Sequence, residues 1–177
     1  MEYQIRIHGR GGQGVVTAAE LLSVAAFLEG RHAQAFPTFG SERTGAPVVS
    51  FCRISDRPIR SREPITEPDA LIIQDATLLG QIDVPAGLRH MLVNSTKDAR
   101  ELGVAGVTIP ASAIALRHVG RPVPNAALLG GFCALTGMLS LESVHAAIRA
   151  TFSGPVAEAN IAAADEAYSD LREAVRA

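Results

Sequence analysis

A cluster of glycines close to the N-terminus constrains the fold of this chain more than any other feature. The stretch Gly9–Gly14 (GRGGQG) follows an alternating segment that contains Ile5 and Ile7, and it precedes a long apolar segment. Glycines between a strand and a helix let the backbone turn tightly and approach a ligand closely. The free amide groups and the dipole of the following helix favour an anion at that point. The sequence therefore predicts a strand, a tight glycine turn and a helix, as in nucleotide-binding α/β domains.

Two interpretations of the glycine cluster stay open. It binds a phosphate-bearing ligand, or it serves only the tight packing of helix on sheet or a subunit contact. An NAD site also needs an acidic residue roughly 20 residues further along the chain. Residues 31–35 (RHAQA) contain none, while Glu29 still belongs to the expected helix and Glu42 to the next loop. We therefore do not expect NAD, and the missing lysine after the glycines argues against a P-loop.

The hydrophobic pattern predicts one α/β domain over residues 1–177. Expected strands are the apolar runs at 3–8, 32–36, 48–54, 69–75, 88–94 and 106–109. Expected helices cover 15–28, 111–119, 125–138, 141–151 and 156–175, with Ser140 as an N-terminal cap. Continuous apolar strands are typical of a sheet covered on both faces. We therefore expect three layers, a mostly parallel but mixed sheet and a helical C-terminal part.

Charge and hydropathy narrow the class of protein. The chain has a net charge of -2 and no run of lysine or arginine, so neither nucleic acid nor an anionic membrane surface is an expected partner. The first ten residues carry charges where a signal peptide needs an apolar stretch, and no apolar run is long enough to span a bilayer. We expect a cytoplasmic protein.

The side chains that could carry chemistry are few. Cys52 and Cys133 are far apart, lie in apolar runs and form no CxxC pair, so a bound iron–sulfur cluster or zinc ion is not expected. Buried free thiols are the favoured interpretation, and a disulfide between the two stays open. His8 flanks the glycines and either faces a ligand or is a satisfied structural histidine. This inventory describes a binding module rather than a self-sufficient catalyst.

Several longer stretches resemble the gamma subunit of pyruvate:ferredoxin oxidoreductase and related 2-oxoacid oxidoreductases. The first is IRIHGRGGQGVVTAAELLSVAAFLEGR, and the second is PTFGSERTGAPVVSFCRIS from Pro37 to Ser55. EPDALIIQD, a strand ending in VNS, PNAALLGG and EANIAAADEAY follow at matching spacing. The resemblance covers nearly the whole chain and implies a Rossmann-like α/β domain.

The resemblance implies an enzyme that oxidatively decarboxylates a 2-oxoacid with coenzyme A (CoA), giving acyl-CoA, carbon dioxide and reduced ferredoxin or NADH. Thiamine diphosphate with Mg and the [4Fe-4S] clusters would reside in a thiamine-binding subunit, a pyrimidine-domain subunit and a ferredoxin-like iron–sulfur subunit. Two alternatives stay open: a stand-alone nucleotide- or CoA-binding regulatory module, and a purely structural subunit whose loop binds nothing. The identity of the 2-oxoacid is not encoded in this chain.

The resemblance also assigns residues, none of them catalytic and none a metal ligand. Those expected to face the CoA pyrophosphate or pantetheine arm are Gly9, Gly11, Gly12, Gln13 and Gly14, with a hydroxyl added by Thr17. A second loop, expected to pack against partner subunits near the active centre, comprises Ser41, Glu42, Arg43, Thr44 and Gly45. Within it Arg43 and Thr44 are assigned to the ligand, and for Arg43 a solvated or interface charge stays open as the alternative. Asn125 and Asn160 are expected to cap helices or to form interface hydrogen bonds.

Overall fold

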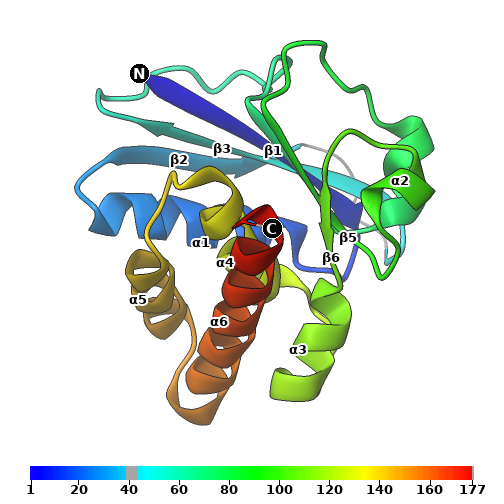
Figure 1. Ribbon diagram of the computed structural model, residues 1–177. Helices are drawn as coiled ribbons and strands as arrows, with labels where there is room; N and C mark the ends of the chain where they lie inside the picture. The colour runs from blue at the N-terminus through cyan, green and yellow to red at the C-terminus, as the bar shows by residue number, and fades with distance from the viewer. Residues whose placement is uncertain (39–43, 177) are drawn as a thin grey trace.

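A six-stranded mixed sheet organises the molecule, as Figure 1 shows for the computed structural model, which describes residues 1–38 and 44–176. The strand order is β2-β3-β1-β4-β5-β6. The strands are β1 (Glu2–Arg10), β2 (His32–Pro37), β3 (Pro47–Ser55), β4 (Ala70–Ile73), β5 (His90–Asn94) and β6 (Val107–Ile109). Each expected apolar run thus forms a strand, and the expected fold class is confirmed.

One strand makes the sheet mixed. β3 pairs antiparallel with both β1 and β2. The other three pairs, β1 with β4, β4 with β5 and β5 with β6, are parallel. The long β1–β3 pairing runs from Glu2 opposite Ser55 to Arg10 opposite Pro47. β3 therefore separates β2 from β1. Because β1, β4, β5 and β6 run in the same direction, their carboxyl ends lie along the same side of the sheet.

The helices cover one face of the sheet in two tiers. They are α1 (Val15–Leu28), α3 (Ala111–Val119), α4 (Asn125–Thr136), α5 (Leu141–Thr151) and α6 (Gly154–Arg176). The helices α1 and α4 are apolar on almost all sides, so they lie against the sheet, and α3, α5 and α6 cover them from outside (Figure 1). The expected helical C-terminal part is confirmed, and Ser140 caps α5 by accepting a hydrogen bond from the Ser143 amide.

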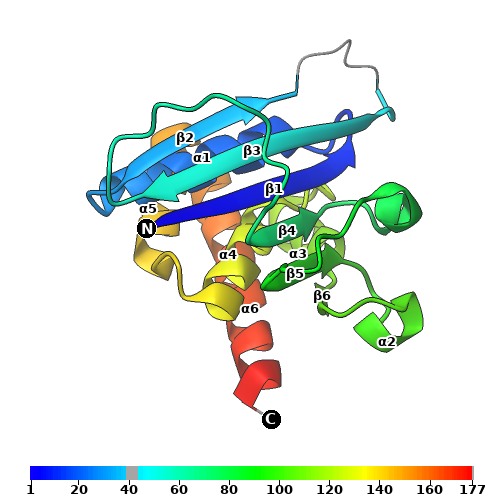
Figure 2. The same cartoon turned by 90° about the horizontal axis from the view of Figure 1, so that it is seen from above.

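The second face of the sheet is covered without long helices. A smaller cluster of buried side chains, Leu71, Ile73, Met91 and Val93, lies under the 3-10 helix η1 (Ala76–Gln81) and the short helix α2 (Ala99–Leu102). The connection from β3 to β4, residues 56–69, runs across the same face (Figure 2). The hydrophobic pattern did not predict η1 and α2, because a segment of one or two turns is too short to establish a helical period.

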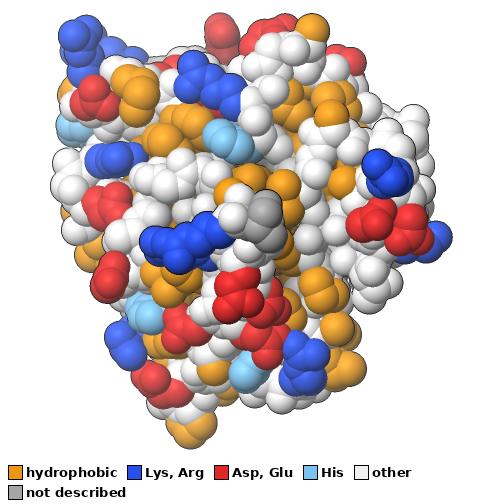
Figure 3. Space-filling model, in the orientation of Figure 1, with side chains coloured by type: hydrophobic (Ala, Val, Ile, Leu, Met, Phe, Trp, Pro, Cys, Tyr) orange, Lys and Arg blue, Asp and Glu red, His pale blue; other side chains and the backbone are white. Residues whose placement is uncertain are grey.

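Charged side chains on the outer helices form ion pairs between neighbouring helices. Arg117 of α3 pairs with Glu166 of α6, and Arg149 of α5 pairs with Glu158 of α6. On the face drawn in Figure 3, acidic and basic side chains are interspersed and form no large patch of one sign. Within the described residues, no helix combines the length and apolarity needed to cross a membrane.

Candidate functional site

The glycine cluster lies where the direction of chain winding changes. After β1 the chain crosses to β2 and β3 on one side of the sheet, and it then returns to β4 on the other side. In open α/β sheets such a change leaves a crevice at the carboxyl ends of the two central strands, and ligands bind there. The turn from Gly11 to Gly14 occupies this position between β1 and α1.

Three of the glycines are required, for two different reasons. Gly12 and Gly14 have φ angles of 91° and 76°, which side chains with a Cβ rarely adopt. Gly9 is instead the next-to-last residue of β1 and is buried, and a Cβ there would lie 2.5 Å from Val15 Cγ2. The turn therefore begins two residues later than Gly9, which corrects the expected turn from Gly9 to Gly14. Gly9 lets α1 pack closely on the sheet and lines none of the hollows beside the loop.

The two segments that carried the family resemblance lie side by side. The Gly11 amide donates to the Ala46 carbonyl over 2.8 Å, and the Gly45 amide donates to the Gly11 carbonyl over 3.1 Å. Thr44 is exposed and forms an isolated parallel bridge with Gly11. The expected residues Ser41, Glu42 and Arg43 lie outside the described part of the chain. Thr44 and Gly45 of the second loop, together with the following Ala46, thus contact the glycine turn directly.

A clasp of three side chains, Arg10, Gln13 and Asp75, holds the glycine turn against the end of β4. Gln13 Oε1 accepts a hydrogen bond from the Arg10 amide over 2.7 Å, and Gln13 Nε2 donates to Asp75 Oδ2 over 2.9 Å. Arg10 Nε lies 3.4 Å from the same carboxylate oxygen. The Gln13 side chain therefore serves the shape of the turn, although the resemblance assigned it to the ligand. The sequence suggests only turn or cap roles for Asp69 and Asp75, the acids at the two ends of the expected strand 69–75. Asp75 does cap η1, since its side chain accepts a hydrogen bond from the Thr77 amide. Its bond to Gln13 was not recognised, because the two residues are more than 60 positions apart.

Hydrogen bonds keep Asp75 ionised. Burial alone would raise the pKa of Asp75, but hydrogen bonds from Thr77 and Gln13 and the charge of Arg10 outweigh burial and lower that pKa. A carboxyl with a lowered pKa stabilises the fold above its unfolded-state pKa, and this contribution is lost as the pH falls through the folded-state value.

Asp75→Asn is expected to lower the free energy of unfolding by about 1 kcal/mol, or roughly 3 °C in melting temperature. The new amide group would face the donors of Gln13 and Arg10, so one hydrogen bond of the clasp is lost. Thermal unfolding of the purified chain measures the effect. Asp69→Asn, at the other end of β4, is the control, because its remaining oxygen can still accept from the Gln4 amide. Equal melting temperatures for Asp75→Asn and the unsubstituted chain would contradict the clasp.

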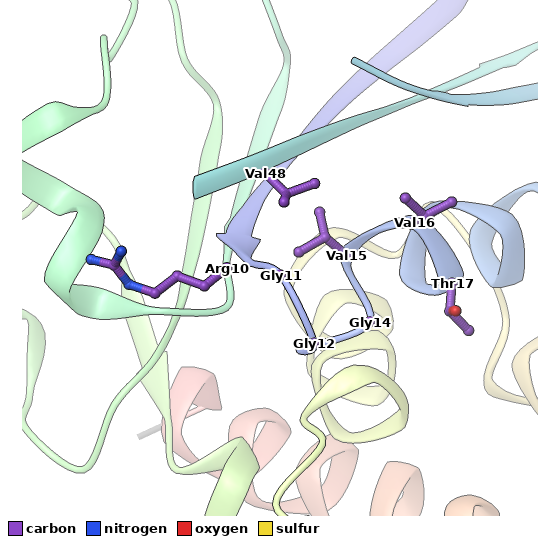
Figure 4. Close-up of a pocket in the computed structure, with 8 residues that line it drawn as sticks. All are labelled: Arg10, Gly11, Gly12, Gly14, Val15, Val16, Thr17 and Val48. Atoms are coloured by element: carbon purple, nitrogen blue, oxygen red, sulfur yellow. The ribbon is translucent and has the colours of Figure 1, made fainter. Parts of the chain in front are cut away.

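Beside the turn, the surface is hollowed by about 270 Å³ (Figure 4). The lining residues are Arg10, Gly11, Gly12, Gly14, Val15, Val16, Thr17 and Val48. The N-terminus of α1 opens into this hollow with no side-chain cap and no acidic residue in its first turn. The first amides of a helix have no intrahelical acceptor, and the helix dipole adds positive potential at that end. The hollow can therefore bind an anionic oxygen, and Thr17 is one of the residues that line it.

His8, which precedes the loop in β1, and the two cysteines have structural roles. His8 Nε2 accepts a hydrogen bond from Arg6 Nε over 2.9 Å, so His8 is the satisfied structural histidine of the two interpretations. Cys52 and Cys133 are both buried free thiols, and burial raises the pKa of each to about 12. Among the residues that the structure describes, no group of three or more His, Cys, Asp or Glu side chains could hold a metal ion.

The arrangement of β2 explains why no ribose-binding acid follows the glycine loop. In a dinucleotide-binding domain the strand after the first helix lies next to the first strand and presents that acid. Here β3 lies between them, so β2 is at the far edge of the sheet. Glu29 at the end of α1 is bound elsewhere, since its Oε1 accepts from the Ser140 amide and the Ser143 hydroxyl. The geometry agrees with the expectation that NAD is not the ligand.

The two expected asparagines differ in their surroundings. Asn125 does not cap α4, because Pro124 holds the cap position without a side-chain hydrogen bond and Asn125 is the first helical residue. Its Oδ1 instead accepts a hydrogen bond from Gln74 Nε2 over 2.8 Å. Asn160 lies inside α6 and donates to the Val156 carbonyl one turn earlier. Helix capping is therefore wrong for both residues.

Comparison with known proteins agrees with the fold and the loop. Residues 4–169 match the family model of pyruvate ferredoxin/flavodoxin oxidoreductase. Pyruvate synthase subunit PorC of Methanocaldococcus jannaschii is 49% identical, over 95% of this chain and 96% of that one. The common subunit gamma of the pyruvate/ketoisovalerate oxidoreductases of Thermococcus kodakarensis is 47% identical, over 94% and 95%. The crystal structure of pyruvate oxidoreductase subunit PORC from Thermotoga maritima superposes with a TM-score of 0.81 at 36% identity, over 95% and 96%. The predicted resemblance to gamma subunits is confirmed, and the chain belongs to the pyruvate ferredoxin/flavodoxin oxidoreductase family.

Proposed function

We propose that this chain is the gamma subunit of a thiamine diphosphate- and iron–sulfur-dependent 2-oxoacid:acceptor oxidoreductase, and that its glycine turn binds CoA. The observation that carries the proposal is the uncapped N-terminus of α1 beside Gly12 and Gly14. Neither of these two glycine amides donates to an acceptor in the described part of the chain. Such amides suit the pyrophosphate of CoA, because a backbone without side chains lets the phosphates approach closely.

The redox centres are assigned to partner subunits. A [4Fe-4S] cluster is held by four cysteine thiolates, and this chain contains only two cysteines, both buried and in different elements. Thiamine diphosphate, when bound in a partner, supplies the carbanion chemistry that releases carbon dioxide from the 2-oxoacid. The clusters, in a partner, would supply one-electron transfer to the acceptor, and the CoA held by this chain would accept the acyl group on its thiol. This chain contributes binding and orientation of CoA.

The first test is co-purification. A tagged chain isolated from its native cell under anoxic conditions is expected to bring larger subunits that carry thiamine diphosphate and iron–sulfur clusters. Recovery of this chain alone would contradict the subunit assignment. It would favour a stand-alone regulatory module, for which calorimetry should show tight binding of CoA, NAD or ATP to the lone chain.

The second test changes the charge of the turn. In the assembled enzyme, Gly12→Asp is expected to raise the KM for CoA roughly 30-fold and to leave the KM for the 2-oxoacid unchanged, because the new carboxylate repels the phosphates. A Cβ at Gly12 meets no atom within 4 Å, so the substitution adds charge without a clash.

Gly12→Asn is the matched control for this substitution. Asparagine has nearly the same shape, carries no charge and tolerates a positive φ, so it reports the backbone cost alone. An unchanged KM for CoA in Gly12→Asp would instead support a purely structural subunit whose turn binds nothing.

A further inference from the structure

The glycine turn has a second side, which faces away from Val48. A groove of about 260 Å³ lies there, with Gly12, Gly14 and Thr17 in one wall. Most of the opposite wall is apolar and comprises Val119, Val123, Ala126, Phe152 and Val156. Three polar side chains also line the groove, Arg121, Asn125 and Asn160. This combination suits an elongated ligand with alkyl and amide groups rather than a compact ion.

Asn125 is the buried polar side chain of this groove. It is 6% exposed, and its Oδ1 is held by Gln74, which is itself 2% exposed and follows β4. A Cβ on Gly14 would lie 2.3 Å from Asn125 Nδ2, so the amide group rests directly on the turn. Within the described residues Asn125 Nδ2 has no acceptor. It is not fully buried either, because the only fully buried side-chain polar atom without a partner among these residues is Gln74 Oε1. Asn125 Nδ2 is therefore a donor that a ligand in the groove can reach.

A purely structural role explains this pair of amides poorly. A buried pair of apolar side chains would fill the same space without leaving Gln74 Oε1 unsatisfied. Aspartate is also favoured in the first turn of a helix, where it balances the dipole. Yet the first turns of α1 and α4, which both border the groove, contain no acidic residue and have no side-chain cap. The groove thus keeps its donors available and its potential positive, with Arg121 adding to that potential.

We propose that Asn125 is a ligand-binding residue of this site and that Gln74 is its positioning residue. Asn125 Nδ2 donates to an oxygen of the phosphorylated amide arm of an acyl-carrying thiol, and the apolar wall packs against the alkyl groups of that arm. This inference rests on the proposed function, because it takes CoA as the ligand of the adjoining turn. It adds that the arm lies on the Asn125 side of the loop.

The test is Asn125→Asp in the assembled enzyme. The substitution keeps an oxygen for Gln74, fits the space above Gly14 and suits a helix N-terminus, so we expect the variant to fold. It replaces the donor by an anionic oxygen, and the KM for CoA is expected to rise about 30-fold. The KM for the 2-oxoacid is expected to stay unchanged. Gln34→Glu is the control, since it also converts a side-chain amide to a carboxylate, keeps an oxygen that accepts from Arg53 and does not line the groove.

Two further variants keep the proposal testable if the first fails to assemble. Asn125→Ser withdraws the donor without adding charge and is expected to raise the KM for CoA about 5-fold. Gln74→Met removes the group that orients Asn125 and is expected to raise it about 3-fold. A purely structural pair would change the melting temperature in both variants and leave the KM for CoA unaltered, which would overturn the proposal.

Comparison with Gly12→Asp separates the two ideas. If Gly12→Asp raises the KM for CoA and the Asn125 variants do not, the assignment of Asn125 is wrong and the proposed CoA site stands. If neither residue affects that KM, the CoA site itself is wrong and the inference falls with it.

Discussion

Gly130→Ala is expected to lower the free energy of unfolding by about 3 kcal/mol, or roughly 10 °C in melting temperature. Gly130 lies in α4 where its backbone crosses α6, and a Cβ there would lie 2.0 Å from the Ala164 carbonyl oxygen. Because that atom belongs to the backbone of another helix, no side-chain rotation relieves the clash and the helices must separate. The gain in helix propensity, about 1 kcal/mol, offsets only part of this cost.

The next residue provides the control for Gly130→Ala. A Cβ at Gly131 would meet Ile109 Cδ1 at 2.7 Å, and this atom is the far end of a side chain that can rotate away. Gly131→Ala gains the same helix propensity and is expected to remain within about 1 kcal/mol of the unsubstituted protein. Thermal and urea unfolding of the two variants measure the difference. Equal stability would show that the close approach of α4 to α6 is not what requires Gly130.

Local sequence patterns predicted the elements better than their arrangement. The bounds of α1, α3 and α5 follow from the hydrophobic pattern, because glycine or a cap residue marks their ends. The short helix α2 had a signal that the pattern of apolar residues does not contain. Asp98 and Glu101 form a capping box and Gly103 ends the helix in the left-handed conformation.

The position of β3 was not predictable from any local pattern. Its apolar run is that of a buried strand, but nothing in the run shows that it pairs antiparallel with β1 and displaces β2 to the edge. That choice depends on contacts between distant residues, such as Glu2 opposite Ser55. The sequence therefore supported a mixed sheet without giving the strand order.

The candidate site, too, was only partly predictable from the sequence. The glycine turn was visible because glycines at fixed spacing have a direct backbone consequence. Asp75, Gln74 and Asn125 were not recognised as neighbours of the turn, since each meets its partners across more than 50 residues of sequence. An acid at the end of a strand has several uses, and only the folded chain shows that Asp75 binds Gln13. The structure thus adds the side chains that shape the turn and one that faces its second side.

Lowering the pH from 7 to 5 is expected to destabilise the protein by about 2 kcal/mol through His8 alone. Burial, reinforced by the charge of Arg6, lowers the pKa of His8 to about 4 from its usual 6.5. Well above pH 6.5 the ring is neutral in both states and contributes no pH dependence. Between pH 6.5 and 4 the unfolded chain binds a proton that the folded chain excludes, so stability falls steadily over that window.

His8→Gln is the variant that isolates this effect. Glutamine can still accept from Arg6 Nε through its side-chain oxygen, but it binds no proton, so its stability is expected to fall less between pH 7 and 5 than that of the unsubstituted protein. Urea unfolding at both pH values measures the difference, and the carboxylates that also titrate in this range cancel in the comparison. His32→Gln, at an exposed position of β2, controls for the loss of a histidine as such.

An identical loss of stability in His8→Gln and the unsubstituted protein would show that His8 accepts a proton as readily in the folded state as in the unfolded one. That result would mean that the hydrogen bond from Arg6 does not persist in solution, because a protonated ring has no lone pair with which to accept it.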